Sequence, residues 1–353
     1  MGKRKILKES FGIISTGAES FLYTLENKNG MIIKLTDYGA AIVSVLVPDK
    51  TGALCDVVLG YDSAEGYEGG DLFLGATVGR NANRIGKAEI TIEGKAYALS
   101  QNEGENNLHS GPNLYNKRLW QAKEEENGVT FSLLSPDGDQ GFPGEAQISV
   151  SYELTDENEI KINYSASSDK TTIFNLTNHS YFNLDGCAFE GEISTVLDQE
   201  VSIFADKFTR TDAASIPTGE LTDVAGTPMD FRFGKKIGLE IDAPYDQLEM
   251  AGGYDHNWAI NKEGLRKAAQ MKSEKSGICM DVYTDLPGIQ FYTANFVDGA
   301  LGKGGAIYPR RCAACFESQF FPDALHHKNF KSPVVKAGDL YKTTTIYAFK
   351  VLA

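Results

Sequence analysis

Residues 175–184, NLTNHSYFNL, place a histidine among apolar and amide side chains where packing alone needs no titrating group. As a β-strand the stretch alternates, with Thr177, His179, Tyr181 and Asn183 on one mostly polar face. Histidine titrates near neutral pH and can donate or accept a proton, so His179 is a candidate catalytic acid or base. The alternative is a core histidine whose ring nitrogens are satisfied by neighbours. This stretch alone leaves both interpretations open.

A carboxylate with unusual neighbours lies near the C-terminal end, within residues 315–323, CFESQFFPD. Glu317 stands there among apolar and aromatic residues. Such surroundings raise the pKa of a carboxyl group and give it the basicity that a proton acceptor requires. Glu317 is therefore the candidate base that complements His179.

Two polar segments offer hydrogen-bond donors. Residues 79–84, GRNANR, end in Asn83 and Arg84, and forked donors of this kind suit sugar hydroxyls or a carboxylate. The glycine spacing is not that of a dinucleotide fingerprint or a phosphate loop, so nucleotide binding is not expected. Residues 106–111, NNLHSG, add His109 in a polar loop. Surface arginines beside a turn and an ordinary loop histidine are the alternatives.

A third group combines aromatic rings with a carboxylate. Residues 253–258, GYDHNW, contain Asp255 between Tyr254 and Trp258. Aromatic faces pack against the apolar side of a pyranose while carboxylates bind its hydroxyls, so this composition suits a sugar. The alternative is a loop with buried aromatics. Nearby, a strand within residues 287–296 places Gln290 and Tyr292 on one face.

Metal-ligand spacing is missing from the sequence. His326 and His327 are adjacent, so their side chains are expected to diverge. The pair Cys312 and Cys315 has the spacing of a redox motif or half a zinc site, but no second pair accompanies it. No metal is predicted, and no nucleophile elbow of the Gly-x-Ser-x-Gly type is present.

Composition and charge exclude some partners. The chain has 353 residues, 42% of them hydrophobic, and a formal net charge of -14. That charge repels nucleic acid and anionic lipid, and only the short basic run at residues 3–5 opposes it, so neither partner is expected. No apolar stretch of signal-peptide length follows that run, and five cysteines without a framework are typical of free thiols. We therefore expect a cytoplasmic protein.

The elements that must position these residues are strands. Short alternating stretches bounded by turn residues recur along the chain, for example at residues 21–25, 31–35 and 41–47. Glu93 and Gly94 separate two such runs and predict a hairpin turn. Helical turns are expected only near residues 63–67 and 322–325. Without a linker or a repeat, residues 1–353 are predicted to form one all-β domain, a large antiparallel β-sandwich with few short helices.

These motifs resemble those of the aldose 1-epimerase family, the galactose mutarotases, in composition and order. The matching blocks are GRNANRI at 79–85, NLHSG at 107–111, NLTNHSYFNL at 175–184, DHN at 255–257, GIQFYT at 288–293 and ESQFFPDA at 317–324. The resemblance implies a galactose mutarotase-like supersandwich, an aldose substrate, His179 as proton donor and Glu317 as proton acceptor. It also implies six sugar-binding residues: Asn83, Arg84, His109, Tyr181, Asp255 and Gln290.

The chemistry of anomer exchange agrees with these residue types. Opening a hemiacetal removes a proton from the anomeric hydroxyl and adds one to the ring oxygen, so an acid and a base suffice and no cofactor is expected. Asp255, if close, would keep His179 protonated. The predicted pH dependence is a bell, its acid limb set by the carboxyl and its basic limb by the imidazole.

Three other functions remain as alternatives. A hexose-6-phosphate 1-epimerase requires a cluster of basic residues around the phosphate. A non-catalytic sugar-binding module does not need His179 and Glu317 as a pair. A glycoside hydrolase uses two carboxylates, and Asp255 with Glu317 nominally supplies them. The expected partner is a small aldose, and the chain is expected to be a monomer or a weak homodimer.

Overall fold

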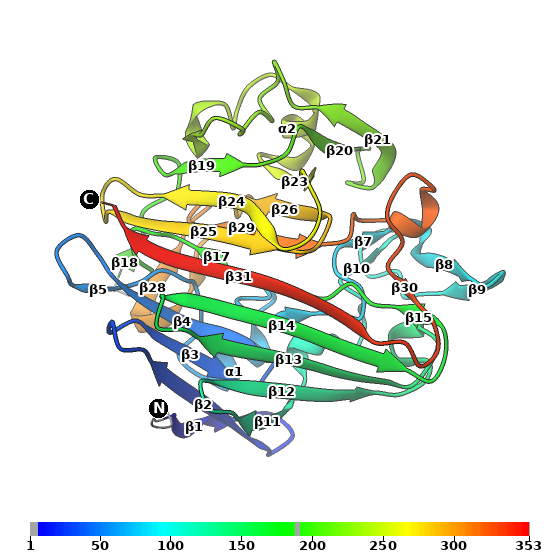
Figure 1. Cartoon of the computed structure of the whole chain (residues 1–353), viewed down its shortest axis with the longest axis horizontal. Helices are drawn as coiled ribbons and strands as arrows, with labels where there is room; N and C mark the ends of the chain where they lie inside the picture. The colour runs from blue at the N-terminus through cyan, green and yellow to red at the C-terminus, as the bar shows by residue number, and fades with distance from the viewer. Residues whose placement is uncertain (1–5, 188–190, 353) are drawn as a thin grey trace.

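Strands make up nearly all the regular structure of the computed structural model, which describes residues 6–187 and 191–352 (Figure 1). Pairing between named strands is antiparallel except where β18 (Gly191–Glu192) pairs with β28 (Ala306–Tyr308). The predicted all-β, antiparallel architecture is confirmed.

The largest layer is a nine-stranded sheet, whose long strands run across the front of Figure 1. In spatial order it contains β11 (Gln121–Glu124), β12 (Gly128–Ser135), β13 (Ala146–Leu154), β14 (Glu159–Ser168), β31 (Tyr341–Val351), β25 (Ile278–Thr284), β24 (Arg266–Lys272), β19 (Glu200–Ile203) and β22 (Lys235–Lys236).

Two further sheets pack against it through a shared core. The six-stranded sheet has the order β17 (Tyr181–Phe182), β29 (Ala314–Gln319), β26 (Gly288–Tyr292), β23 (Asp255–Ala259), β20 (Lys207–Thr211) and β21 (Pro217–Asp223). The five-stranded sheet has the order β1 (Leu7–Ile13), β2 (Glu19–Glu26), β3 (Ile32–Thr36), β4 (Ala41–Pro48) and β5 (Leu54–Asp56).

Short elements complete the fold. The remaining strands are β6 (Thr77–Val78) with β16 (Thr177–Asn178), β7 (Arg84–Ile85) with β10 (Asn107–Leu108), β8 (Glu89–Ile92) with β9 (Lys95–Ala98), β15 (Thr172–Ile173) with β30 (Val334–Val335), and β27 (Ala300–Leu301) beside β28. The helices are α1 (Ala64–Gly69), α2 (Asp246–Ala251) and the 3-10 turns η1 (Gly86–Ala88), η2 (Tyr115–Lys117), η3 (Asp139–Gly141), η4 (Ile237–Leu239), η5 (Lys303–Gly305) and η6 (Ala324–His326). The predicted hairpin at Glu93 and the helical turns α1 and η6 are confirmed; α2 and the 3-10 turns η1 to η5 were not predicted.

One hydrophobic core joins the three large sheets, because their strands alternate between buried and exposed residues. In β13 every second residue, from Ala146 to Leu154, is buried. Across the core, Tyr23 of β2 meets Phe131 of β12, with ring centroids 5.8 Å apart. The hydroxyl of Tyr347 in β31 donates to the carbonyl of Phe316 in β29 over 3.1 Å. Each fully buried aromatic ring contributes ~1.5–3 kcal/mol, so these layers hold the six-stranded sheet firmly in place.

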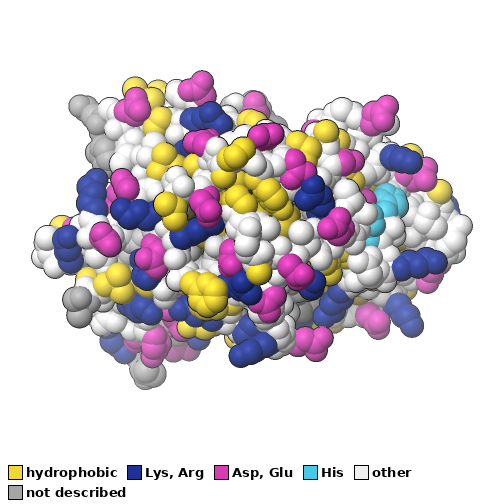
Figure 2. All heavy atoms as spheres, turned by 90° about the horizontal axis from the view of Figure 1, so that it is seen from above, with side chains coloured by type: hydrophobic (Ala, Val, Ile, Leu, Met, Phe, Trp, Pro, Cys, Tyr) yellow, Lys and Arg dark blue, Asp and Glu magenta, His cyan; other side chains and the backbone are white. Residues whose placement is uncertain are grey.

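The surface carries both signs of charge. Figure 2 shows basic and acidic side chains interspersed over the drawn face, so the negative net charge is not concentrated there. In the described part of the chain, no helix combines the length and apolar character of a membrane span.

Candidate active site

The six-stranded sheet has one polar face, and pairing register brings its side chains together. Glu317 of β29 lies opposite Gln290 of β26, and Tyr292 of β26 lies opposite Asp255 of β23. Successive side chains of a strand point to opposite faces. The alternate residues of these strands therefore belong to the hydrophobic core: Trp258, Ile289, Phe291 and Phe316.

His179 lies in the short link between β16 and β17, at the edge of this sheet. The predicted continuous strand is thus interrupted at the histidine. The backbone N–H of His179 donates to the carbonyl of Ala76 over 2.9 Å, and its carbonyl accepts from Gly75 over 3.0 Å. The imidazole is stacked on Tyr181 and on Phe73, at centroid distances of 5.0 and 5.9 Å. These contacts fix the plane of the ring.

The imidazole of His179 and the carboxyl of Glu317 form a buried pair. Nε2 lies 3.6 Å from Oε1, and both side chains are under 10% exposed (7% and 3%). Burial lowers the pKa of His179 to about 4. Burial, followed by the negative charge of Asp255, raises the pKa of Glu317 well above its ordinary value. Over the pH range between these two pKa values, the pair holds one proton.

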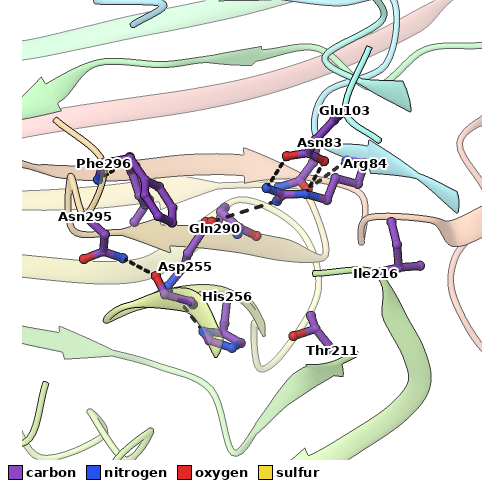
Figure 3. Close-up of polar contacts among 12 residues, drawn as sticks. Asn83, Arg84, Glu103, Thr211, Ile216, Asp255, His256, Gln290, Asn295 and Phe296 are labelled. Atoms are coloured by element: carbon purple, nitrogen blue, oxygen red, sulfur yellow. Dashed lines mark hydrogen bonds and ion pairs between the residues drawn. The ribbon is translucent and has the colours of Figure 1, made fainter. Parts of the chain in front are cut away.

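Arg84 lies between two carboxylates at the cavity wall (Figure 3). Its Nε and one terminal nitrogen donate to the two oxygens of Glu103 over 2.7 and 2.8 Å. Its other terminal nitrogen lies 3.9 Å from Asp255, which also accepts from Gln290 over 2.7 Å. The charge of Asp255 is thus directed to Arg84 and Gln290. The lowered pKa of His179 does not support the expectation that Asp255 keeps His179 protonated.

Asn83 and His109 hold each other in place across two loops. The backbone N–H of Asn83 donates to Nδ1 of His109 over 3.1 Å, and the N–H of His109 donates to the carbonyl of Asn83 over 3.2 Å. Both residues have positive φ angles, 63° and 53°. Burial lowers the pKa of His109 well below its ordinary value, so its ring is neutral. Because Nδ1 accepts a hydrogen bond, the ring proton is on Nε2, where His109 acts as a donor.

A cavity of about 1220 Å³ brings most of the expected residues together. It is lined by Asn83, Arg84, His109, His179, Tyr181, Asp255 and Glu317, among others. Gln290 reaches the site through its hydrogen bond to Asp255. Loops at residues 71–73, 103–106 and 212–216, together with Phe296, contribute much of the remaining lining. A hexose fills only a small part of such a volume.

Three ligand-type atoms of His109, His179 and Glu317 lie within 4.8 Å of one another. The donor types are those of a catalytic zinc site. However, Nδ1 of His109 accepts the N–H of Asn83, which leaves the ring proton on Nε2. A protonated ring nitrogen has no lone pair for a metal, so this arrangement does not fit a metal ligand set.

Arg80 and Arg84 both belong to the polar segment at residues 79–84, and the structure separates their roles. Arg80 is fully buried and donates to the carbonyls of Pro143 and Gly144 over 2.9 and 3.1 Å, so it is a structural residue. Neither Arg80 nor its neighbour Asn81 lines the cavity.

Three contributors were missed. Glu103 and Phe73 do not belong to any motif that the sequence shows. Phe73 has a φ of 56°, which a bulky residue rarely adopts. Its ring packs against the rings of His109 and His179. Asp323 accepts from the N–H of Gly86 over 2.8 Å. His326 and His327, expected to diverge, both approach Asp323, at 2.6 and 3.4 Å.

Comparison with known proteins decides the family. The model of the family described as aldose 1-epimerase matches residues 22–348. The chain belongs to the aldose 1-epimerase family. It is 40% identical over 348 residues to the galactose mutarotase of Bos taurus, covering 98% of this chain and 99% of that protein. It is 39% identical over 349 residues to the aldose 1-epimerase of Escherichia coli K12, with the same coverage.

The fold of the aldose 1-epimerase family agrees with the structure. A crystal structure of an aldose epimerase homologue from C. elegans matches with a TM-score of 0.85 and 33% identity, covering 95% of this chain and 100% of that one. The prediction of a galactose mutarotase-like sandwich is therefore confirmed.

Proposed function

We propose that this protein interconverts the α and β anomers of free hexoses such as glucose and galactose. The observation that carries the proposal is the buried pair of His179 and Glu317, 3.6 Å apart on the wall of the cavity. Relatives named galactose mutarotase and aldose 1-epimerase, similar over almost their full length, support it.

In the proposed mechanism the reacting form carries the single proton of the pair on His179: Glu317 accepts the proton of the anomeric hydroxyl while His179 donates its proton from Nε2 to the ring oxygen. The bond between C1 and the ring oxygen breaks, and an aldehyde forms. Rotation about C1–C2 presents the other carbonyl face, and the ring closes as both groups act in reverse. Within the described structure, Oε2 of Glu317 is buried and has no hydrogen-bond partner, so no donor of the protein stabilises the charge at that oxygen.

The other residues hold the sugar. His109 donates from Nε2, Asp255 accepts from hydroxyls, and Arg84 donates from the nitrogen that faces Asp255. Tyr181 and Gln290 complete this proposed set beside the acid and base. Because an acid and a base suffice, we propose that the reaction needs neither a cofactor nor a metal.

Charge in the cavity favours a free sugar over a hexose phosphate. Eight carboxylate residues line it: Asp71, Glu89, Glu103, Glu105, Asp212, Asp255, Glu317 and Asp323. The lysines and arginines of the lining are Lys87 and Arg84, and Arg84 is already engaged by Glu103. A phosphate dianion in this field is repelled.

The experiment is exchange of anomers followed by polarimetry and NMR. We expect rapid exchange with α-galactose or α-glucose, little acceleration with their 6-phosphates, and no release of methanol from the methyl glycosides. Methanol release would establish a glycoside hydrolase. Binding of sugar without accelerated exchange would establish a non-catalytic module.

We further propose that residues 1–353 act as one catalytic domain, as a monomer or weak homodimer in the cytoplasm. The core that joins all three large sheets supports a single unit, and five free cysteines fit a reducing compartment. Sedimentation velocity at several concentrations tests the oligomeric state.

A further inference from the structure

The imidazole of His179 has a thiol behind it where many reactive histidines have a carboxylate. Sγ of Cys315 lies 3.7 Å from Nδ1, and Oε1 of Glu317 lies 3.6 Å from Nε2. Cys315 and Glu317 are two residues apart in β29, so their side chains leave the same face of the strand. A single strand therefore contacts both ring nitrogens.

Stacking alone does not fix the orientation of this ring. Tyr181 and Phe73 lie nearly parallel to the imidazole, each at an interplanar angle of 25°. The two aromatic rings hold the plane of the imidazole, but they permit a half-turn of the imidazole about its Cβ–Cγ bond, which keeps that plane. After such a rotation a ring carbon, instead of Nε2, would face Glu317. The contact of Nδ1 with Cys315 removes that freedom, because only a nitrogen gains from a thiol neighbour.

A thiol also differs chemically from a carboxylate as a partner. Burial, followed by the charge of Glu317, raises the pKa of Cys315 well above its ordinary value, so the sulfur stays protonated and neutral. A neutral thiol donates weakly to an unprotonated Nδ1 and accepts weakly from a protonated one. The thiol can therefore interact with Nδ1 in both protonation states of His179. It does not favour the imidazolium strongly, as a carboxylate would.

We propose that Cys315 is a positioning residue for anomer exchange: its thiol orients the ring of His179 so that Nε2 faces Glu317, and leaves Nε2 free to gain and release the proton. This role rests on the proposed function. Cys315 itself has no exposed surface and does not line the cavity, so it acts through His179.

The test compares Cys315→Ala with Cys315→Ser. Alanine removes the Nδ1 partner, and serine restores a donor and acceptor of similar size. We expect kcat to fall about 10- to 100-fold in Cys315→Ala with KM within about threefold, as for other partners that orient a reactive histidine, and to recover at least tenfold in Cys315→Ser. In sugar-free protein, ¹⁵N NMR should show the tautomer distribution of His179 altered by alanine and restored toward a single form by serine.

Cys312→Ala is the matched control. Cys312 is another buried thiol of the same core cluster, three residues earlier, and the described structure gives it no contact with a histidine. We expect unchanged kcat and an unchanged His179 spectrum. Loss of rate in both alanine variants, with equal thermal destabilisation, would indicate a packing effect and overturn the proposal.

Two outcomes are kept apart by design. If folded Cys315→Ala retains the wild-type rate, pH profile and tautomer, the positioning role is wrong. If wild-type protein fails to exchange anomers, the proposed function is wrong, whereas the sugar-free NMR comparison still decides whether the thiol orients the ring. If Cys315→Ala does not fold, Cys315→Val, which fills the space of the thiol without a polar atom, takes its place, and a wild-type rate with an unchanged His179 signal there overturns the proposal.

Discussion

The two faces of β23, β26 and β29 are formed by alternate residues of the same strands and have different roles. One face, with Phe316 and Phe291, packs against the nine-stranded sheet and is closed to solvent. The other face presents Glu317 and Asp255 to a cavity. Both faces are buried along β29, so burial does not distinguish them. The two faces differ in the residues around each side chain, which are apolar on the core face and polar on the cavity face.

This comparison indicates how the fold supports chemistry. The core face anchors the strands, which also makes the polar face rigid. The proposed base is therefore held by sheet pairing, and the proposed acid by the short link beside β17. Burying a carboxyl with one unpartnered oxygen costs stability. The core face offsets that cost, and the two faces should therefore respond to substitution in opposite ways.

The largest effect on rate is expected on the polar face. Glu317→Gln keeps the shape of the side chain but removes the basic oxygen, so kcat should fall by roughly two to four orders of magnitude. Affinity for galactose should stay within about tenfold, or ~1.4 kcal/mol, because the other binding residues remain. Polarimetry and calorimetry measure the two quantities. A parallel loss of rate and affinity would make Glu317 a binding residue.

The matching change on the core face is Phe316→Ala. Deleting a fully buried aromatic ring should reduce the free energy of unfolding by about 3–5 kcal/mol, measured by denaturant titration. Activity per folded molecule should stay within about tenfold of wild type. Phe131→Ala, which removes a ring from the same core far along the nine-stranded sheet, is the control for ring loss. If Phe316→Ala instead abolishes activity while stability is unchanged, the two faces are not separable.

The pH profile of kcat/KM tests how the polar face is protonated. The pair of His179 and Glu317 needs one proton to react. The rate should therefore rise with pH through about 4, where the pair loses the first of its two protons from His179. It should fall above the raised pKa of Glu317, where the pair loses the remaining proton. This reverses the limbs that the sequence predicts, because burial disfavours both charges. In His179→Gln the limb near pH 4 should disappear from the residual activity. A persistent limb there would assign it to another group.

A smaller effect is expected at the rim. Glu103→Gln removes the charge that holds Arg84, so KM should rise about tenfold with a smaller change in kcat. The control is Glu125→Gln, which breaks the exposed pair with Lys123 away from the cavity and should leave KM unchanged. Equal effects of the two substitutions would mean that Arg84 does not depend on Glu103.

The smallest effect concerns stability. Because the folded-state pKa of Glu317 is raised above an unfolded value of ~4.3, the native state binds more protons between these pKa values, and wild-type stability falls as pH rises through that window. Because glutamine does not titrate, the stability of Glu317→Gln does not decrease over this pH window. At pH 8 it should be more stable than wild type by about 0.5–2 kcal/mol, with the difference vanishing near pH 4. Thermal unfolding at several pH values measures it.

Local sequence pattern was sufficient for the strands and singled out the two residues of the proposed acid and base. Alternation revealed β2, β3 and β4, and the apolar neighbours of Glu317 indicated its raised pKa. Pairing between distant elements was not readable. Nothing in the sequence separates Arg80, whose donors meet carbonyls in the core, from Arg84, whose donors meet Glu103. Likewise, α2 is too short to show helical periodicity.

The division of the cavity between strands and loops has an evolutionary consequence. The proposed base and acid lie on β29 and on the link beside β17, whereas much of the remaining lining comes from separate loops at residues 71–73, 103–106 and 212–216. Loops accept insertions and substitutions that a buried strand does not. A duplicated copy of this gene can therefore acquire a new sugar preference by loop exchange while it inherits the proton-transfer pair unchanged.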